Sequence, residues 1–186
     1  QNTSSHLIAI GYNALQLNIG GTSNIAIGNY ALASNIGGSN NVALGYTNLR
    51  YNVSGSLNTA LGSQVLPNVD FSGNNNTGVG YRALYGVTTG YDNTAIGKGA
   101  GQTITSGFNN TVIGSGATAS SPTASNEMTL GNGITVLRCG TTTITGISDV
   151  RDKTNIEDIP VGLDYINALR PVKFDWNTRD GTKIGE

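Results

Sequence analysis

A glycine recurs through the first 131 residues at an almost constant interval. The intervals between successive anchor glycines are 17, 17, 17, 18, 17, 17 and 17 residues. A fixed period of this kind is typical of repeat architectures, in which each unit buries its apolar face against its neighbours. The anchor glycines are Gly11, Gly28, Gly45, Gly62, Gly80, Gly97, Gly114 and Gly131.

Each position of the unit has its own chemistry. A branched aliphatic residue precedes every anchor, a small residue usually stands two before it, and a second apolar pair such as Ala31-Leu32 follows it. Asparagine stands four positions before the anchor at Asn24, Asn41, Asn58, Asn76, Asn93 and Asn110. A second glycine stands seven before it at Gly21, Gly38, Gly55, Gly73, Gly90 and Gly107.

These positions predict stacked β coils. The four residues from asparagine to the aliphatic alternate in character, which is typical of a short strand. The glycines mark corners where the backbone needs a positive φ or approaches a neighbour closely. Equivalent side chains then lie over one another at about 4.8 Å per coil. We expect the asparagines to form an amide ladder, and the alanine and isoleucine columns to fill a thin core.

The thinness of that core predicts an oligomer. One coil buries two large aliphatic residues at most, against a backbone entropy cost of about 1–2 kcal/mol per residue. A single chain is expected to leave its second apolar column exposed. Three chains around a common axis would bury both columns, so we predict a homotrimer.

The repeat resembles those of phage tail fibres and related surface proteins, of the form NTAIGYxALxxNxxGxxN. It is also similar to the shorter AIG repeats in the heads of trimeric autotransporter adhesins. The resemblance covers residues 6–133. It implies an all-β fold, a trimeric parallel β-solenoid shaft of the β-roll or β-prism type.

The composition changes near residue 147. Residues 1–147 hold 7 of the 21 charged residues, and the last 39 residues hold the other 14 with only 3 of the 27 glycines. We therefore predict 17-residue β repeats over 1–131, a β neck or cap over 132–147, and a small α+β segment over 148–186. Within that segment Pro160 suits a helix start, and Pro171 its end.

The segment that begins with Ser148 carries the one chemical motif. The string SDVRDKTNI and the following GLDYINALRPVKFDW resemble the C-terminal intramolecular chaperone of endosialidases and other phage tail fibres and tailspikes. The resemblance implies a domain that trimerises the fibre, continues past Glu186, and cuts itself off before a serine. By position, Ser148 is the nucleophile, Lys153 its general base, and Ile147–Ser148 the scissile bond.

This chemistry is physically reasonable, because a serine hydroxyl needs a base and a lysine acts as one only when burial lowers its pKa. Trimer formation would supply that burial. The resemblance thus implies at most a single-turnover serine–lysine autoprotease. It does not imply an enzyme that turns over a substrate in this segment.

Other functions find little support in the sequence. The net charge of −1 predicts no attraction to nucleic acid, and no apolar run approaches the ~20 residues that insertion into a membrane needs. The lone Cys139 is interpreted as a buried small hydrophobe. His6 is the one histidine, so no multi-histidine metal site forms within a chain, and no cofactor is predicted.

Four tyrosines gather after the anchor glycines. Exposed rings there would stack on sugars, but packing between the coils is the favoured interpretation. The four are Tyr12, Tyr30, Tyr46 and Tyr81.

The sequence therefore predicts a structural, host-recognition fibre of a phage virion. Its expected partners are two more copies of itself, other tail or fibre proteins, and a cell-surface glycan or protein receptor. The alternative is a bacterial trimeric adhesin or cell-surface fibre with the same chaperone. A third class, a depolymerase, would lie upstream of Gln1, since the only acids before residue 147 are Asp70, Asp92 and Glu127. The chain is expected to be a piece of a longer protein.

Overall fold

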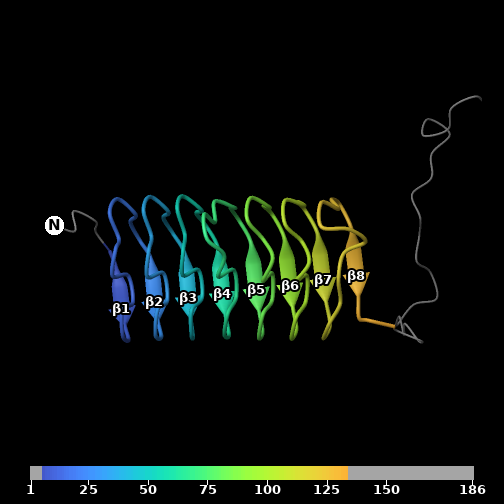
Figure 1. Ribbon diagram of the computed structural model, residues 1–186, viewed down its shortest axis with the longest axis horizontal. Coiled ribbons are helices and arrows are strands. Elements are labelled where there is room, and N and C mark those ends of the chain that lie inside the picture. Colours follow the sequence, from blue (N-terminus) through green and yellow to red (C-terminus); the bar gives the residue numbers. More distant parts are fainter. Residues whose placement is uncertain (1–5, 134–186) are drawn as a thin grey trace, which may run out of the picture. The chain divides into compact units, whose positions relative to one another are not determined.

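The structure is a computed structural model, and it describes residues 6–133. Within that range it holds eight parallel three-residue strands and no helix. The strands pair in chain order, so each coil lies beside the next one along the chain (Figure 1). They are β1 (Ile8–Ile10), β2 (Ile25–Ile27), β3 (Val42–Leu44), β4 (Thr59–Leu61), β5 (Thr77–Val79), β6 (Thr94–Ile96), β7 (Thr111–Ile113) and β8 (Met128–Leu130).

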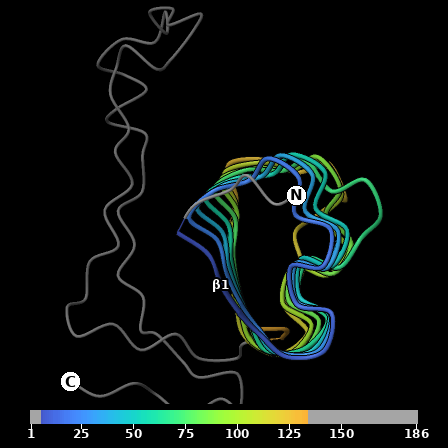
Figure 2. The ribbon, with the colours of Figure 1, turned by 90° about the vertical axis from the view of Figure 1, so that its left-hand side faces the viewer.

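The register of the sheet follows the repeat. Ala26 pairs with Ala43 and Ala43 with Ala60, each exactly one unit along the chain. The predicted all-β, parallel β-solenoid is therefore confirmed. Equivalent residues of successive coils form columns along the stack, as the view along its axis shows (Figure 2).

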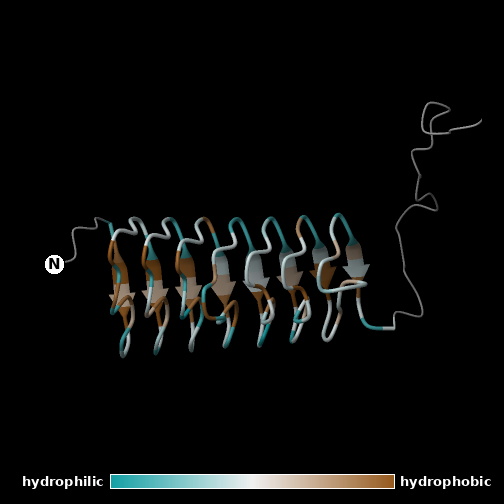
Figure 3. Ribbon diagram, turned by 45° about the horizontal axis from the view of Figure 1, so that its top comes forward, coloured by the Kyte–Doolittle hydropathy of each residue, from teal (hydrophilic) through white to brown (hydrophobic). Residues whose placement is uncertain are grey.

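One detail of the predicted core was wrong. The middle residue of each strand points inward, as at Ala26, Ala43 and Ala60, which are fully buried. Neighbouring strand residues point to opposite faces, so the aliphatic before the anchor lies outside: Leu61 is 44% and Ile96 is 42% exposed. Figure 3 shows the apolar strands β1, β2 and β3 in brown. The isoleucine column therefore does not fill the core.

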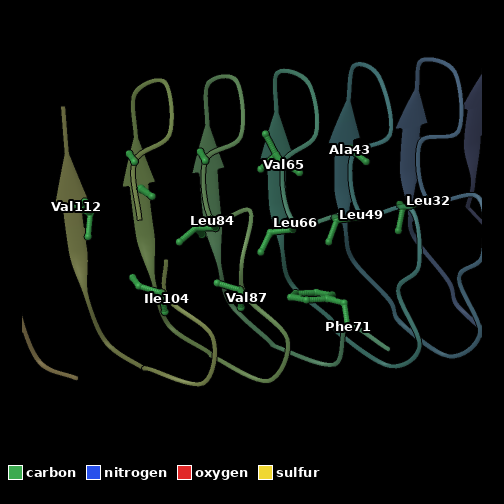
Figure 4. Close-up of a cluster of buried hydrophobic side chains, with 14 of the residues drawn as sticks. Leu32, Ala43, Leu49, Val65, Leu66, Phe71, Leu84, Val87, Ile104 and Val112 are labelled. Atoms are coloured by element: carbon green, nitrogen blue, oxygen red, sulfur yellow. The ribbon is translucent and has the colours of Figure 1, made fainter. Parts of the chain in front are cut away.

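The second apolar column, expected at the surface of a single chain, is instead the core. Its leucines stack in a row inside the solenoid (Figure 4). They adopt a left-handed backbone, with φ of 48° at Leu32 and 49° at Leu49. That conformation costs about 1–2 kcal/mol per residue, which burial of a leucine side chain, at about 1.5–3 kcal/mol, offsets. The column consists of Leu15, Leu32, Leu49, Leu66 and Leu84.

The amide ladder forms as predicted. Asn41 shows its chemistry: its Nδ2 donates to Asn24 Oδ1 at 3.2 Å and to the Gly55 carbonyl at 2.9 Å. Its Oδ1 accepts from the backbone N–H of Asn58 at 3.0 Å and from Asn58 Nδ2 at 3.1 Å. From Asn41 to Asn110, each such amide links its own coil to both neighbours. Since buried polar groups need partners, the ladder holds the coils in register.

The two glycine columns serve different purposes. The anchors from Gly11 to Gly114 have φ between 119° and 137°. At Gly45, where φ is 119°, a Cβ would lie 1.7 Å from the carbonyl oxygen of Gly62. Gly38 has no positive φ, but its Cβ would lie 2.2 Å from the Gly55 carbonyl oxygen. The anchor positions require glycine both for the positive φ and for the missing Cβ. The second glycine column requires it only because a Cβ would collide with the next coil.

The single 18-residue interval interrupts the stack between Gly62 and Gly80. The coil that carries it, green in Figure 2, bulges away from the others. One corner of the coil also changes here. The coils before the interval bury an asparagine at this corner, and the later coils bury an apolar side chain: Asn18, Asn35 and Asn52 give way to Phe71, Val87 and Ile104. Figure 4 shows the last three in one row.

Candidate binding surface

The residues predicted for self-cleavage lie outside the described part of the chain. This holds for Ile147, Ser148 and Lys153, and for the chaperone segment 148–186. Of the predicted neck, only residues 132 and 133 are described. The domain boundaries at 131 and 147 therefore stay predictions.

The tyrosines after the anchors are more exposed than predicted. Tyr12, Tyr46 and Tyr81 are 64%, 50% and 45% exposed. Tyr12 still contacts the next coil, because its ring lies edge-on to that of Tyr30 with 5.4 Å between the centroids. Packing between coils is therefore wrong for Tyr46 and Tyr81. Tyr30 is half-buried. The reason is local: the two residues after the anchor form the outside of a corner whose interior is already filled by the leucine column.

Two arginines lie against tyrosine rings on this surface, two of which belong to the set after the anchors. The guanidinium carbon of Arg50 lies 4.5 Å from the ring centroid of Tyr30 and 4.8 Å from that of Tyr51. That of Arg82 lies 5.2 Å from the Tyr81 centroid and 4.9 Å from the Tyr85 centroid. Such cation–π contacts are worth about 0.5–1 kcal/mol at exposed sites. Each arginine thus sits over two tyrosines.

A pocket of about 330 Å³ opens between these clusters, over the irregular coil. Tyr46, Arg50 and Tyr51 come from the coil before it, and Tyr85 comes from the coil after it. The bulged coil supplies four further lining residues. Those residues are Gln64, Pro67, Asn68 and Val69, with Thr47 completing the lining.

A second hollow, of about 280 Å³, lies farther along the stack. It is lined by Tyr81, Arg82, Lys98 and Gln102, among others. Together the two hollows include Arg50, Arg82 and Lys98, which are the only lysine or arginine residues between positions 6 and 133. This surface therefore carries all the positive side chains of the described range.

No metal site is found in the described residues: they hold no group of three or more His, Cys, Asp or Glu side chains placed to bind an ion. His6 is exposed at the first coil. Nor does any helix in the part of the chain that the structure covers have the length and apolarity to cross a bilayer.

Comparison with known families bears on the C-terminal segment. Residues 148–185 match the family model described as the chaperone of endosialidase. That match covers the string beginning at Ser148 on which the resemblance was based. The C-terminal segment is thus similar to an intramolecular chaperone, and the β-solenoid is the region before it. No curated protein and no solved structure shows a significant match to the chain.

Sequence reasoning missed two features of the solenoid. Asn18, Asn35 and Asn52 form a second amide column, with Asn35 Nδ2 donating to Asn18 Oδ1 at 2.6 Å and Asn52 Nδ2 to Asn35 Oδ1 at 2.7 Å. Their 17-residue spacing was a visible signal. The arginine–tyrosine clusters gave no such signal, because Arg50 and Arg82 occupy different positions of the repeat.

Proposed function

We propose that this chain is the shaft segment of a homotrimeric phage tail fibre, followed by a chaperone that assembles it and then detaches. The observation that carries the proposal is the aliphatic column on the outer face of the sheet. Ile10, Ile27, Leu61, Ile96, Ile113 and Leu130 are all at least 37% exposed there. The match of residues 148–185 to the endosialidase chaperone supports it.

The outer column favours assembly with copies of the same chain. Its members lie one per coil, and the parallel pairing of the strands places them beside one another. The apolar stripe therefore runs along the whole sheet. Partly buried residues Ile25 and Val42 flank it on the same face. Continuous apolar surface of this kind marks an interaction site. A second and a third solenoid with the same period match its spacing coil for coil.

Self-cleavage would follow assembly. Burial in the trimer lowers the pKa of the Lys153 amine, which then removes the Ser148 hydroxyl proton. The oxygen attacks the carbonyl carbon of Ile147, the Ile147–Ser148 peptide bond breaks, and the serine amine takes up the proton. Water then hydrolyses the resulting ester and frees the shaft from the chaperone.

Mass spectrometry of a full-length product that includes the rest of the chaperone tests cleavage. A new N-terminus at Ser148 in the wild type, together with an intact Ser148→Ala chain, is the expected result. Equal cleavage of both chains would overturn the assignment of the serine.

Light scattering tests the trimer. Wild type should scatter as three chains. The double variant Leu61→Glu/Ile96→Glu, which places charge in the outer column, should scatter as one chain and keep its β circular dichroism. Thr103→Glu, at an exposed position outside the strands, is the matched control and should stay trimeric. A wild-type monomer would defeat the proposal.

A further inference from the structure

We propose that the pocket formed by Tyr46, Arg50, Tyr51 and Tyr85 binds a saccharide unit that carries an anionic substituent. This inference adds a recognition role to the proposed fibre and rests on that proposal. The solenoid is otherwise regular, and this pocket lies where the regularity fails.

The rings of the pocket present apolar faces beside polar groups. Tyr46 is 50% and Tyr85 is 37% exposed, and both line the same hollow from either side of the bulged coil. Tyrosine offers a flat apolar surface and a hydroxyl that donates or accepts. Sugars have the matching chemistry, since C–H faces alternate with hydroxyl edges. The volume, about 330 Å³, lies near the lower end of the ~300–1,000 Å³ usual for ligand pockets, which suits one sugar unit of a longer glycan.

The pocket is held in place without a ligand. Asn68 Nδ2 donates to the backbone carbonyl of Tyr85 at 2.6 Å and to that of Val87 at 3.0 Å, which ties the bulged coil to the next one. Arg82 Nε donates to Gln64 Oε1 at 2.8 Å while its guanidinium lies against Tyr85. Binding therefore orders few side chains, and preorganisation of this kind favours affinity.

Charge selects the ligand class. The Arg50 guanidinium lies over Tyr30 and Tyr51, and within residues 6–133 neither Arg50 nor Arg82 forms an ion pair with a carboxylate. A guanidinium that stacks on rings still carries N–H groups in its plane, where they donate to a carboxylate or sulfate. Lys98 extends the positive surface into the neighbouring hollow. An acidic sugar fits this surface better than a neutral one.

The pocket does not compete with the proposed trimer contact for residues. Its lining comes from the corner after the anchor and from the bulged coil, whereas the aliphatic column lies on the strands. No residue of that column lines the pocket. Recognition and assembly thus use separate residues.

The test is binding of the full chain to a panel of uronate-containing, sulfated and matched neutral oligosaccharides, followed by calorimetry with the best binder. Wild type should prefer acidic members, with affinity falling as salt rises. Tyr46→Ala and Arg50→Gln should each weaken binding about tenfold or more, and Tyr46→Phe should keep most of it. Tyr91→Ala is the matched control: Tyr91 is 42% exposed, stacks on Phe108 and lies outside the pocket, so binding should be unchanged.

Three results would overturn the inference: no binding by any oligosaccharide, equal binding of neutral members, or unchanged affinity of the Tyr46→Ala and Arg50→Gln variants. Circular dichroism and light scattering on the same samples separate this failure from that of the proposed function. A chain that trimerises and is cleaved yet binds no glycan defeats only the pocket. A monomer that binds acidic glycans defeats only the trimeric fibre.

Discussion

The side-chain oxygen of Asn52 is buried without a hydrogen bond, because Phe71 stands beside it where the next asparagine of the column would be. The two residues pair through a parallel bridge, and among the described residues Oδ1 of Asn52 is the one buried side-chain polar atom without a partner. The Asn52 Nδ2 still donates to Asn35 Oδ1 and to the Gly55 carbonyl. The column therefore ends in a buried, unpaired acceptor, which costs about 1–3 kcal/mol.

Asn52 stands at the end of its amide column, whereas Asn41 lies inside the longer amide ladder. This difference gives the first prediction. Asn41→Leu should lower the free energy of unfolding by several kcal/mol, because the buried backbone N–H of Asn58 loses its acceptor and Asn24 Oδ1 loses one of its two donors. Asn52→Leu should cost at least about 2 kcal/mol less. It removes an already unpaired oxygen and moves the end of the column to Asn35.

Urea unfolding of the two variants measures the difference. The Gly55 carbonyl keeps one donor in either variant, since both Asn41 and Asn52 donate to it. Equal destabilisation by the two substitutions would contradict the account of the column end.

The anchor glycines give a second prediction. Gly45→Ala should lower stability by about 3 kcal/mol or more, because the new Cβ collides with the Gly62 carbonyl at a φ of 119°. Gly37→Ala is the control: the nearest atom to its Cβ is the Val53 oxygen at 3.8 Å, and its φ is not positive. It should be neutral or slightly stabilising. Thermal unfolding compares the two, and similar losses would contradict the steric argument.

A third substitution should stabilise the protein. Leu57 has a φ of 61° and is 57% exposed, while the equivalent position of other coils holds Asn40, Asn75 and Asn109. Asparagine tolerates the left-handed conformation better than leucine. Leu57→Asn should therefore raise the free energy of unfolding by about 0.5–1 kcal/mol.

Valine is the informative control at the same site, because its branched Cβ disfavours a positive φ most strongly. Leu57→Val should lower the midpoint of urea unfolding. A higher midpoint for valine than for asparagine would rule out backbone strain as the cause.

The fourth prediction concerns pH. Hydrogen bonds from the Ser120 hydroxyl, and then from the Ser120 backbone N–H at 2.9 Å, hold the pKa of the Glu127 carboxyl below its usual value. A depressed folded pKa contributes stability above the unfolded pKa, and that contribution is lost as pH falls through the folded value.

Thermal unfolding of wild type and Glu127→Gln at pH 7 and pH 3 checks it. The advantage of wild type should be small, since the carboxyl is exposed to solvent, and it should shrink at pH 3. If the stability advantage of wild type over Glu127→Gln grew on acidification, the lowered pKa of the Glu127 carboxyl would be contradicted.

The repeat alone was enough to predict the parallel coils, the Asn24-to-Asn110 ladder and the glycine corners, because each is a column of identical residues. It did not reveal which apolar column lies inside. Leu32 and Ile27 are both aliphatic, and the choice depends on where the three-residue strand begins and on the left-handed backbone at Leu32. The pocket was hidden for a related reason. Tyr46, Gln64 and Tyr85 occupy different positions of the repeat and line one pocket at the coil that carries the inserted residue.

The irregular coil has a further consequence for how such a chain finds its fold. A stack of near-identical coils can mispair by one whole unit at little cost, since alanine still meets alanine and asparagine still meets asparagine. Phe71 and the change of corner content after Asn52 occur once, so a mispaired stack would place a phenylalanine against the wrong neighbour. The one irregular coil thus fixes the register of the whole stack, because every other coil pairs correctly only at its own distance from Phe71.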